Sequence, residues 1–213
     1  MITPAATVFV IDDDESVRKS LKRLLDAARY EAEVFKSASE FLSRSAYQGP
    51  SCVIVDVKMP GLNGIDFQEA LIEHRREEQL IFITAHGDIP MCAQAMKAGA
   101  VDFLPKPFKP KQLLESVERA LARSSEQLLR ASERIHARAL LQRLTPREHE
   151  VMELVATGLL NKQVGGQLGM AEKTVKTHRA HMMQKLKITS VAELMVILQK
   201  AEISPPVKPG TKV

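Results

Sequence analysis

Cysteine is scarce in this chain, and long apolar stretches are missing from it. The 213 residues include only two cysteines, Cys52 and Cys92, and neither has a partner at metal-ligand spacing, which excludes a cysteine-based metal site. No apolar run approaches the roughly 20 residues that a membrane-spanning helix needs, so we expect no membrane span. The first residues lack a basic segment followed by an apolar one, so we expect no signal peptide and a cytoplasmic location.

The length and the charge distribution indicate two domains. A chain of 213 residues with 45% hydrophobic and 26% charged residues can form two globular cores. Residues 1–110 contain 13 Lys and Arg against 16 Asp and Glu, whereas residues 144–200 contain 8 against 5. An acidic first half and a basic second half predict that the two domains have different partners.

Short apolar runs alternate with helical patterns in the first half of the chain, which we assign to a domain at residues 7–123. We expect strands at residues 8–11, 32–35, 52–57, 80–84 and 101–104. We expect helices at residues 16–28, 65–76 and 89–98. This alternation predicts the α/β class, with a doubly wound, flavodoxin-like parallel sheet of five strands. Chemistry in such sheets takes place at the carboxyl ends of the strands.

Helical patterns fill the rest of the chain from Pro110 onward. We expect a helical linker at residues 124–143, an all-α domain of four helices at residues 144–203, and a disordered tail at residues 204–213. Two of the helices begin with typical capping boxes, at residues 145–148 and 190–193. Leucine or isoleucine recurs every seven residues from residue 114 to residue 135, which leaves open a weak coiled coil or a solvated connector helix.

Polar residues occur where the expected strands end. Asp12 and Asp13 follow the first strand, Asp56 lies in the third, Thr84 ends the fourth, and Lys106 follows the fifth. Converging carboxylates repel one another and favour a hard divalent cation such as Mg²⁺ (or Mn²⁺). With that charge neutralised, Asp56 can attack the phosphorus of a phosphoryl group, whose oxygens Lys106 and Thr84 can bind. Any one of these residues alone is more often structural or solvated, but the five together predict a phosphoryl-acceptor site.

The first domain resembles a response-regulator receiver domain. The resemblance rests on four stretches: VFVIDDD at residues 8–14, DVKMPG at 56–61, TAHG at 84–87 and GAVDFLPKPF at 99–108. It implies that Asp56 accepts a phosphoryl group from a partner histidine kinase. It also implies a set of Mg²⁺ ligands, namely Asp12 or Asp13, Asp56 and the backbone carbonyl of Lys58.

The same resemblance implies a conformational switch. Phosphorylation would draw Thr84 towards Asp56, and the ring of Phe103 would turn into the space that Thr84 leaves. The altered face, formed by residues 89–98 and 101–104, would then promote a homodimer. The family also implies a cis peptide bond between Lys106 and Pro107, which is tolerable only before proline.

A helix-turn-helix is expected in the second half of the chain. A short helical segment, a glycine turn and a basic helical segment follow one another there. Residues 172–187 hold five Lys and Arg against one acidic residue. One face of this helix carries Lys173, Lys176, Thr177 and Ala180. Such a face can neutralise phosphates and reach base edges, although a solvated surface helix would show the same charge pattern.

Residues 144–200 resemble a LuxR-type helix-turn-helix domain. The resemblance rests on LTPRE at residues 144–148, Val151, Gly158, NK at 161–162 and TVKTHR at 174–179. With the receiver in front, the chain resembles the NarL/FixJ family of transcription regulators, and its FixJ branch in particular. The family implies that bases are contacted by Lys176, Thr177 and Ala180. It implies that phosphates are held by Lys162, Thr174, His178 and Arg179.

This segment departs from the family at three positions. Gly165 and Gly166 stand within a helix where the family usually has alanine or another helix former, and each glycine costs up to about 1 kcal/mol there. Ala171 stands where a serine commonly caps the recognition helix, and a lost cap costs about 1 kcal/mol. We therefore expect a helix-turn-helix of low stability.

We expect a phosphorylation-dependent transcription regulator that binds promoter DNA and RNA polymerase, and not an enzyme. A phosphatase of the haloacid-dehalogenase type is disfavoured because Lys58 stands where such enzymes have a second acid. An interaction module that needs no phosphorylation is disfavoured because the acidic site is complete. We also expect Lys58 and His86, each two residues past a site residue, to set the rate of autodephosphorylation.

Overall fold

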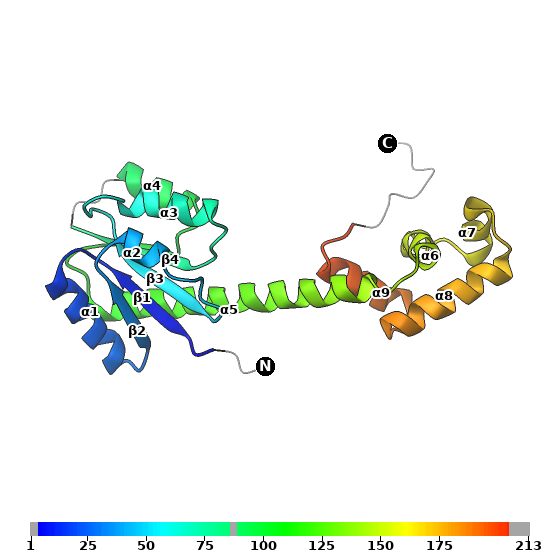
Figure 1. Cartoon of the computed structure of the whole chain (residues 1–213), viewed down its shortest axis with the longest axis horizontal. Coiled ribbons are helices and arrows are strands. Elements are labelled where there is room, and N and C mark those ends of the chain that lie inside the picture. Colours follow the sequence, from blue (N-terminus) through cyan, green and yellow to red (C-terminus); the bar gives the residue numbers. More distant parts are fainter. Residues whose placement is uncertain (1–3, 86–88, 205–213) are drawn as a thin grey trace. The chain divides into compact units, whose positions relative to one another are not determined.

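The computed structural model of the chain describes residues 4–85 and 89–204, which divide into two compact units (Figure 1). The first unit is Met1–Leu128 and the second is Leu129–Val213. Helix α5 (Pro110–Leu141) contributes residues to both units. Apart from Ser204, the tail that we expect to be disordered lies outside the described residues, and so does His86.

Five parallel strands form the sheet of the first unit. They are β1 (Thr7–Ile11), β2 (Glu31–Phe35), β3 (Ser51–Asp56), β4 (Gln79–Thr84) and β5 (Asp102–Pro105). Their order in the sheet is β2-β1-β3-β4-β5, so the chain reverses its direction of winding at the boundary between β1 and β3. This confirms the predicted α/β class with a doubly wound parallel sheet.

Helices cover both faces of this sheet. They are α1 (Glu15–Ala27), α2 (Ala38–Leu42), α3 (Gly64–Glu73), α4 (Ile89–Lys97) and the first part of α5. Helices α1 and α5 pack with Val8 and Val10 on one face, whereas α2, α3 and α4 pack with Phe9 and Ile11 on the other. Because both faces of β1 are covered, all five of its residues are buried, which explains its continuous apolar run.

Helix α2 was not expected from the sequence. It has only five residues, and its first turn depends on Ser37, whose hydroxyl accepts a hydrogen bond from the backbone N–H of Glu40. Its Phe41 is fully buried and contacts the rings of Phe9 and Phe67 edge-on. Five residues, of which Ala38 and Phe41 are buried, are too few to show a helical periodicity, so tertiary packing rather than pattern determines this helix.

The second unit is helical throughout its regular structure. The last turns of α5 pack with α6 (Pro146–Ala156), α7 (Asn161–Leu168), α8 (Glu172–Leu186) and α9 (Val191–Lys200) around one apolar core. The predicted capping box at the start of α6 is present, with Thr145 and Glu148 bonded to each other's backbone N–H groups. At α9, Ser190 caps the helix, but the Glu193 carboxylate accepts from the Thr189 N–H instead of the Ser190 N–H.

Only some of the heptad side chains of α5 are exposed and free to pack against a second helix. Leu114 and Leu121 pack in the core of the first unit, and Leu121 is only 8% exposed. Ile135 is 68% exposed. Because half of the heptad positions pack against the sheet, the connector helix is the better interpretation of the pattern. None of the helices in the described part of the chain is long and apolar enough to cross a membrane.

Candidate functional site

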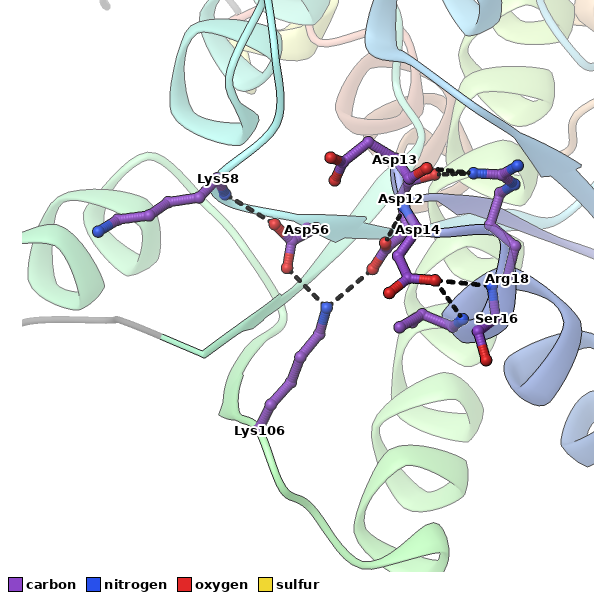
Figure 2. A network of polar contacts seen from close by, with 9 residues as sticks. Asp12, Asp13, Asp14, Ser16, Arg18, Asp56, Lys58 and Lys106 are labelled. Atoms are coloured by element: carbon purple, nitrogen blue, oxygen red, sulfur yellow. Dashed lines mark hydrogen bonds and ion pairs between the residues drawn. The ribbon is translucent and has the colours of Figure 1, made fainter.

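The ammonium group of Lys106 joins two carboxylates at the carboxyl edge of the sheet (Figure 2). Asp12 follows β1 and Asp56 ends β3, and these strands are parallel neighbours at the point where the winding reverses. Lys106 Nζ lies 2.8 Å from Asp12 Oδ2 and 2.8 Å from Asp56 Oδ1. The structure therefore brings together three of the predicted site residues from three different strand ends.

Backbone N–H groups hold the other oxygen of each carboxylate. Asp14 donates to Asp12 Oδ1 at 2.9 Å, and the N–H of Lys58 donates to Asp56 Oδ2 at 2.8 Å. Asp12 is 1% exposed and Asp56 is 6% exposed. Both carboxylates are thus oriented before any ligand arrives, which is the arrangement that electrostatic catalysis needs.

Burial and ion pairing act in opposite directions on this cluster. Burial is the largest influence on Asp12 and raises its pKa, while the hydrogen bonds from Lys106 and the Asp14 N–H lower it. Burial lowers the pKa of Lys106, but its bonds to Asp12 and Asp56 outweigh this and leave that pKa raised. Lys106 therefore stays protonated at neutral pH, and added positive charge beside Asp12 would stabilise its ionised form.

Asp13 does not join the cluster. Its side chain is exposed and makes no hydrogen bond or ion pair within the part of the chain that the structure describes. Those residues also contain no group of three or more His, Cys, Asp and Glu side chains placed to hold a metal ion. The expectation that three carboxylates converge at this edge of the sheet is therefore correct for two of them, because the exposed Asp13 side chain lies apart from the cluster.

The oxygen donors nevertheless suit Mg²⁺. Two buried carboxylates and the adjoining peptide of Lys58 form a hard, incomplete ligand set, and Mg²⁺ commonly takes one or two protein carboxylates and keeps several waters. The Lys58 side chain is exposed and extends away from Asp56, so only its backbone lies at the cluster (Figure 2).

The residues expected to form the switch lie on the neighbouring strands. Thr84 ends β4 and is 1% exposed, and its carbonyl accepts a hydrogen bond from the Lys106 N–H at 2.7 Å. Phe103 on β5 is half-buried, with its ring centroid 6.1 Å from that of Phe82. The bond between Lys106 and Pro107 is cis, which confirms that expectation.

Sequence reasoning missed two residues that shape the acidic loop. Asp14 caps α1 by accepting from the backbone N–H of Ser16 at 2.7 Å, and an acid just ahead of a helical pattern could have signalled this role. Arg18 donates from one guanidinium nitrogen to the carbonyls of Asp12 and Asp13, at 2.7 and 2.8 Å. No sequence pattern announces a bond from a side chain to two backbone carbonyls.

Helix α8 of the second unit presents its predicted DNA-reading face to solvent. Lys173, Lys176, Thr177 and Ala180 are exposed on it, and Lys162 and Thr174 are exposed nearby. The opposite face buries Val175, Met182 and Leu186 in the core. His178 and Arg179 are half-buried, and Arg179 donates to the Asn161 side chain at 3.1 Å, which ties the start of α7 to α8.

An ion pair between a buried glutamate and a half-buried lysine also holds α8 in place, and it was not expected from the sequence. Glu148 is 3% exposed, and its Oε2 accepts from Lys185 Nζ at 2.6 Å and from the Thr145 N–H at 2.8 Å. Burial acts most strongly on Glu148 and raises its pKa, but the bonds from Lys185 and Thr145 outweigh it and leave the pKa lowered. One carboxylate therefore joins the start of α6 to the recognition helix.

The two glycines of α7 differ in their surroundings, which corrects the expectation that both are avoidable costs to stability. A Cβ at Gly165 would lie 2.6 Å from the Met170 carbonyl oxygen, so glycine is required there by the close approach of the turn. A Cβ at Gly166 would meet nothing within 4 Å. Only Gly166 is therefore an avoidable cost. At the start of α8, Ala171 makes no side-chain cap, as expected.

Single alanine substitutions test this difference. We expect Gly166→Ala to raise the free energy of unfolding of the second unit by about 0.5 to 1 kcal/mol, because alanine restricts the unfolded chain and fits an exposed helical position. Gly165→Ala should lower it, because the new Cβ must displace the turn at Met170. Urea unfolding of the two full-length variants measures both changes in the free energy of unfolding. Equal changes in the two variants would show that the close contact at Gly165 does not matter.

Comparison with known proteins places both units in described families. The model of the response regulator receiver domain matches residues 8–118, and that of the bacterial regulatory proteins of the luxR family matches residues 142–198. Nodulation protein W of Bradyrhizobium diazoefficiens is 44% identical over 199 residues, covering 93% of this chain and 88% of that protein.

Two solved structures resemble the chain over both units. The low-resolution structure of the response regulator StyR has a TM-score of 0.82 and 45% identity, covering 92% of this chain and 100% of StyR. Full-length FixJ from B. japonicum has a TM-score of 0.55 and 34% identity, covering 94% of this chain and 98% of FixJ. The chain therefore belongs to the NarL/FixJ family of two-component response regulators, which are transcriptional regulators with a receiver domain and a LuxR-type DNA-binding domain, not enzymes.

Proposed function

We propose that Asp56 accepts a phosphoryl group from a partner histidine kinase, and that this modification increases DNA binding through α8. The bridge from Lys106 to Asp12 and Asp56, at 2.8 Å to each, is the observation that supports this most strongly. A basic group fixed beside a nucleophilic carboxylate is placed to bind the oxygens of an incoming phosphoryl group.

Asp12, Asp56 and the backbone carbonyl of Lys58 would hold Mg²⁺ (or Mn²⁺), and Asp13 could add a ligand or a water contact from the exposed side of the loop. When bound, the cation would neutralise part of the negative charge on the phosphoryl oxygens. An oxygen of Asp56 forms the new bond to phosphorus while the phosphorus–nitrogen bond of the kinase phosphohistidine breaks, and its electron pair leaves with the imidazole.

Phosphorylation would bias a conformational equilibrium in the receiver. The added group brings about two negative charges and strong acceptor oxygens, which the Lys106 ammonium and the Thr84 hydroxyl can bind. Phe103, half-buried on the adjacent strand, can then change its packing against Phe82 and alter the face formed by α4 and β5. A homodimer formed on that face would position two α8 helices on promoter half-sites about one helical turn apart.

In the proposed complex the DNA-binding residues divide by role. Bases would be contacted by Lys176, Thr177 and Ala180, all of which are exposed. Phosphates would be held by Lys162, Lys173, Thr174, His178 and Arg179. We further propose that the protein is cytoplasmic, that it contacts RNA polymerase at its promoter, and that Lys58 and His86 set the lifetime of the phosphoryl group.

The acceptor assignment predicts the loss of labelling in a single variant. Full-length wild type incubated with Mg²⁺ and acetyl phosphate should gain one phosphoryl group, read by intact mass and located by peptide mapping. Asp56→Asn should gain none, because an amide is not a nucleophile towards phosphorus. Asp26→Asn, which changes an exposed aspartate near the end of α1, should be labelled like wild type. Undiminished labelling of Asp56→Asn would refute the assignment.

The division of roles on α8 predicts different losses on different DNA. Lys176→Ala should weaken binding to a specific site by about 1 to 3 kcal/mol and should weaken binding to random duplex much less. Lys162→Ala should weaken both about equally and reduce the salt dependence of binding. Fluorescence anisotropy with both duplexes measures these losses. Equal losses for Lys176→Ala on the two duplexes would show that Lys176 contacts only phosphate.

A further inference from the structure

We infer that Arg18 is a positioning residue of the phosphoryl-acceptor site: it fixes the backbone of the acidic loop, so that the Asp12 carboxylate is oriented for a divalent cation. This inference rests on the proposed function, because it concerns how the same site is prepared for its ligand. Arg18 lies on α1 and does not touch Asp56 or Lys106 in the network that Figure 2 shows.

The contact is made to backbone, not to a carboxylate. One nitrogen of the Arg18 guanidinium, NH1, donates to the carbonyl oxygen of Asp12 at 2.7 Å and to that of Asp13 at 2.8 Å. Two carbonyls that point to one place repel each other and are stable there only when a donor lies between them. A guanidinium is always charged and presents several donors in a fixed plane, so it can hold both carbonyls at once.

The orientation of these carbonyls determines where the opposite N–H groups point. In a planar trans peptide the carbonyl of one residue and the N–H of the next point in opposite directions. When Arg18 holds the Asp13 carbonyl, the Asp14 N–H is directed to the other side of the chain. That N–H donates to Asp12 Oδ1 at 2.9 Å. The same peptide is therefore bonded at both of its ends.

A continuous path of contacts then runs from α1 to Asp56. Arg18 holds the Asp13 carbonyl, the Asp14 N–H on the same peptide holds Asp12 Oδ1, and Asp12 Oδ2 accepts from Lys106 at 2.8 Å. Lys106 also contacts Asp56. Without Arg18 the two carbonyls can turn towards water, and the Asp12 carboxylate loses the donor that fixes its rotation.

The chain offers a matched control one helical turn further along α1. Lys22 lies four residues after Arg18, and it too donates to a backbone carbonyl, that of Ala32 on β2, at 2.9 Å. It contacts Asp26 and does not contact the acidic loop. Lys22→Ala therefore removes a bond of the same kind from the same helix and leaves Asp12, Asp13 and Asp14 untouched.

The test measures cation binding apart from activity. For full-length wild type, Arg18→Ala and Lys22→Ala, Mg²⁺ is titrated by amide chemical shifts, and labelling by acetyl phosphate is timed at a series of Mg²⁺ concentrations. Arg18→Ala should raise the Mg²⁺ concentration for half-saturation by about 10-fold or more, as losses of supporting contacts at metal sites do. Its labelling rate should recover most of its value at saturating Mg²⁺, and Lys22→Ala should match wild type in both readouts. Arg18→Lys, which retains a cation, should fall between Arg18→Ala and wild type.

Two results would overturn the inference. Half-saturation in Arg18→Ala equal to that of Lys22→Ala would mean that Arg18 serves only stability. A labelling rate in Arg18→Ala that is reduced equally at every Mg²⁺ concentration would mean that it acts on another step. Failure of wild type to bind Mg²⁺ or to become labelled is a different outcome, because it refutes the proposed function itself.

Discussion

Lys106→Met should slow labelling of Asp56 by acetyl phosphate about 100-fold, the loss expected when one preorganised donor to a developing negative charge is removed. Methionine keeps much of the volume of the side chain and removes the ammonium group that contacts Asp12 and Asp56. The rate is measured by quenching the reaction at set times and reading intact mass. Saturating Mg²⁺ should not restore the rate, because a cation held by the carboxylates would not replace the ammonium group that Lys106 offers to the phosphoryl oxygens.

A change in the pKa of Asp12 is a second, independent prediction for Lys106→Met. In wild type the hydrogen bond and charge of Lys106 lower the pKa of Asp12 against the effect of burial. Removal of Lys106 should therefore raise the pKa of Asp12 further above its ordinary value. Titration of the carboxyl carbon by NMR measures this shift. Lys109→Met, which changes an exposed lysine beyond the site, should leave the rate and this pKa unchanged, and a wild-type rate in Lys106→Met would contradict the role of Lys106.

Glu148→Ala should lower the free energy of unfolding of the second unit by about 2 to 3 kcal/mol, the sum of a lost helix cap and a lost charge-assisted hydrogen bond. The Glu148 side chain is 4% exposed and that of Lys185 is 37% exposed, so water can solvate Lys185 only in part when its partner is gone. Urea unfolding of the full chain, with amide hydrogen exchange to locate the change, measures the loss. Binding of α8 to DNA should weaken with it.

Two further variants separate this contact from general effects of substitution. Glu153→Ala removes an exposed carboxylate from the same helix and should change stability little. Glu148→Gln keeps an acceptor for the Thr145 N–H and loses the ion pair, so it should fall between alanine and wild type. Because the pKa of Glu148 is lowered on folding, its stabilisation is present above the ordinary carboxyl pKa and disappears as the pH falls through the lowered one. A stability difference between wild type and Glu148→Gln that persists in strong acid would contradict this assignment.

The fold could be predicted from sequence wherever burial imposes a pattern. Strands β1, β3 and β4 are buried at every position, and each appears in the sequence as an apolar run with its end marked by Asp12, Asp56 or Thr84. The basic helix expected within residues 172–187 occurs as α8, Glu172–Leu186. Helix α2 could not be predicted, because its five residues make little more than one turn, which is too short to show a helical pattern.

The sequence indicates which residues form the site, but not which hydrogen bonds connect them. The order of polar residues at strand ends predicts that Asp12, Asp56 and Lys106 meet, because a parallel sheet brings these ends to one edge. Whether Asp13 also meets them depends on the turn of one peptide, which side-chain chemistry does not determine. Arg18 bonds to backbone oxygens, which no side-chain pattern marks. Lys185 bonds to Glu148, which lies 37 residues away in the sequence, so no local spacing reveals that pair.

The proposed function depends on control of the DNA affinity of α8 by a phosphoryl group on Asp56. The most direct test maps binding sites across the genome, and then measures the affinity of the purified full chain for one mapped site before and after labelling with acetyl phosphate. Wild type should bind the site more tightly after labelling, and the affinity of Asp56→Asn should not change. An affinity that does not respond to labelling in wild type, or that responds equally in Asp56→Asn, would contradict the proposed function.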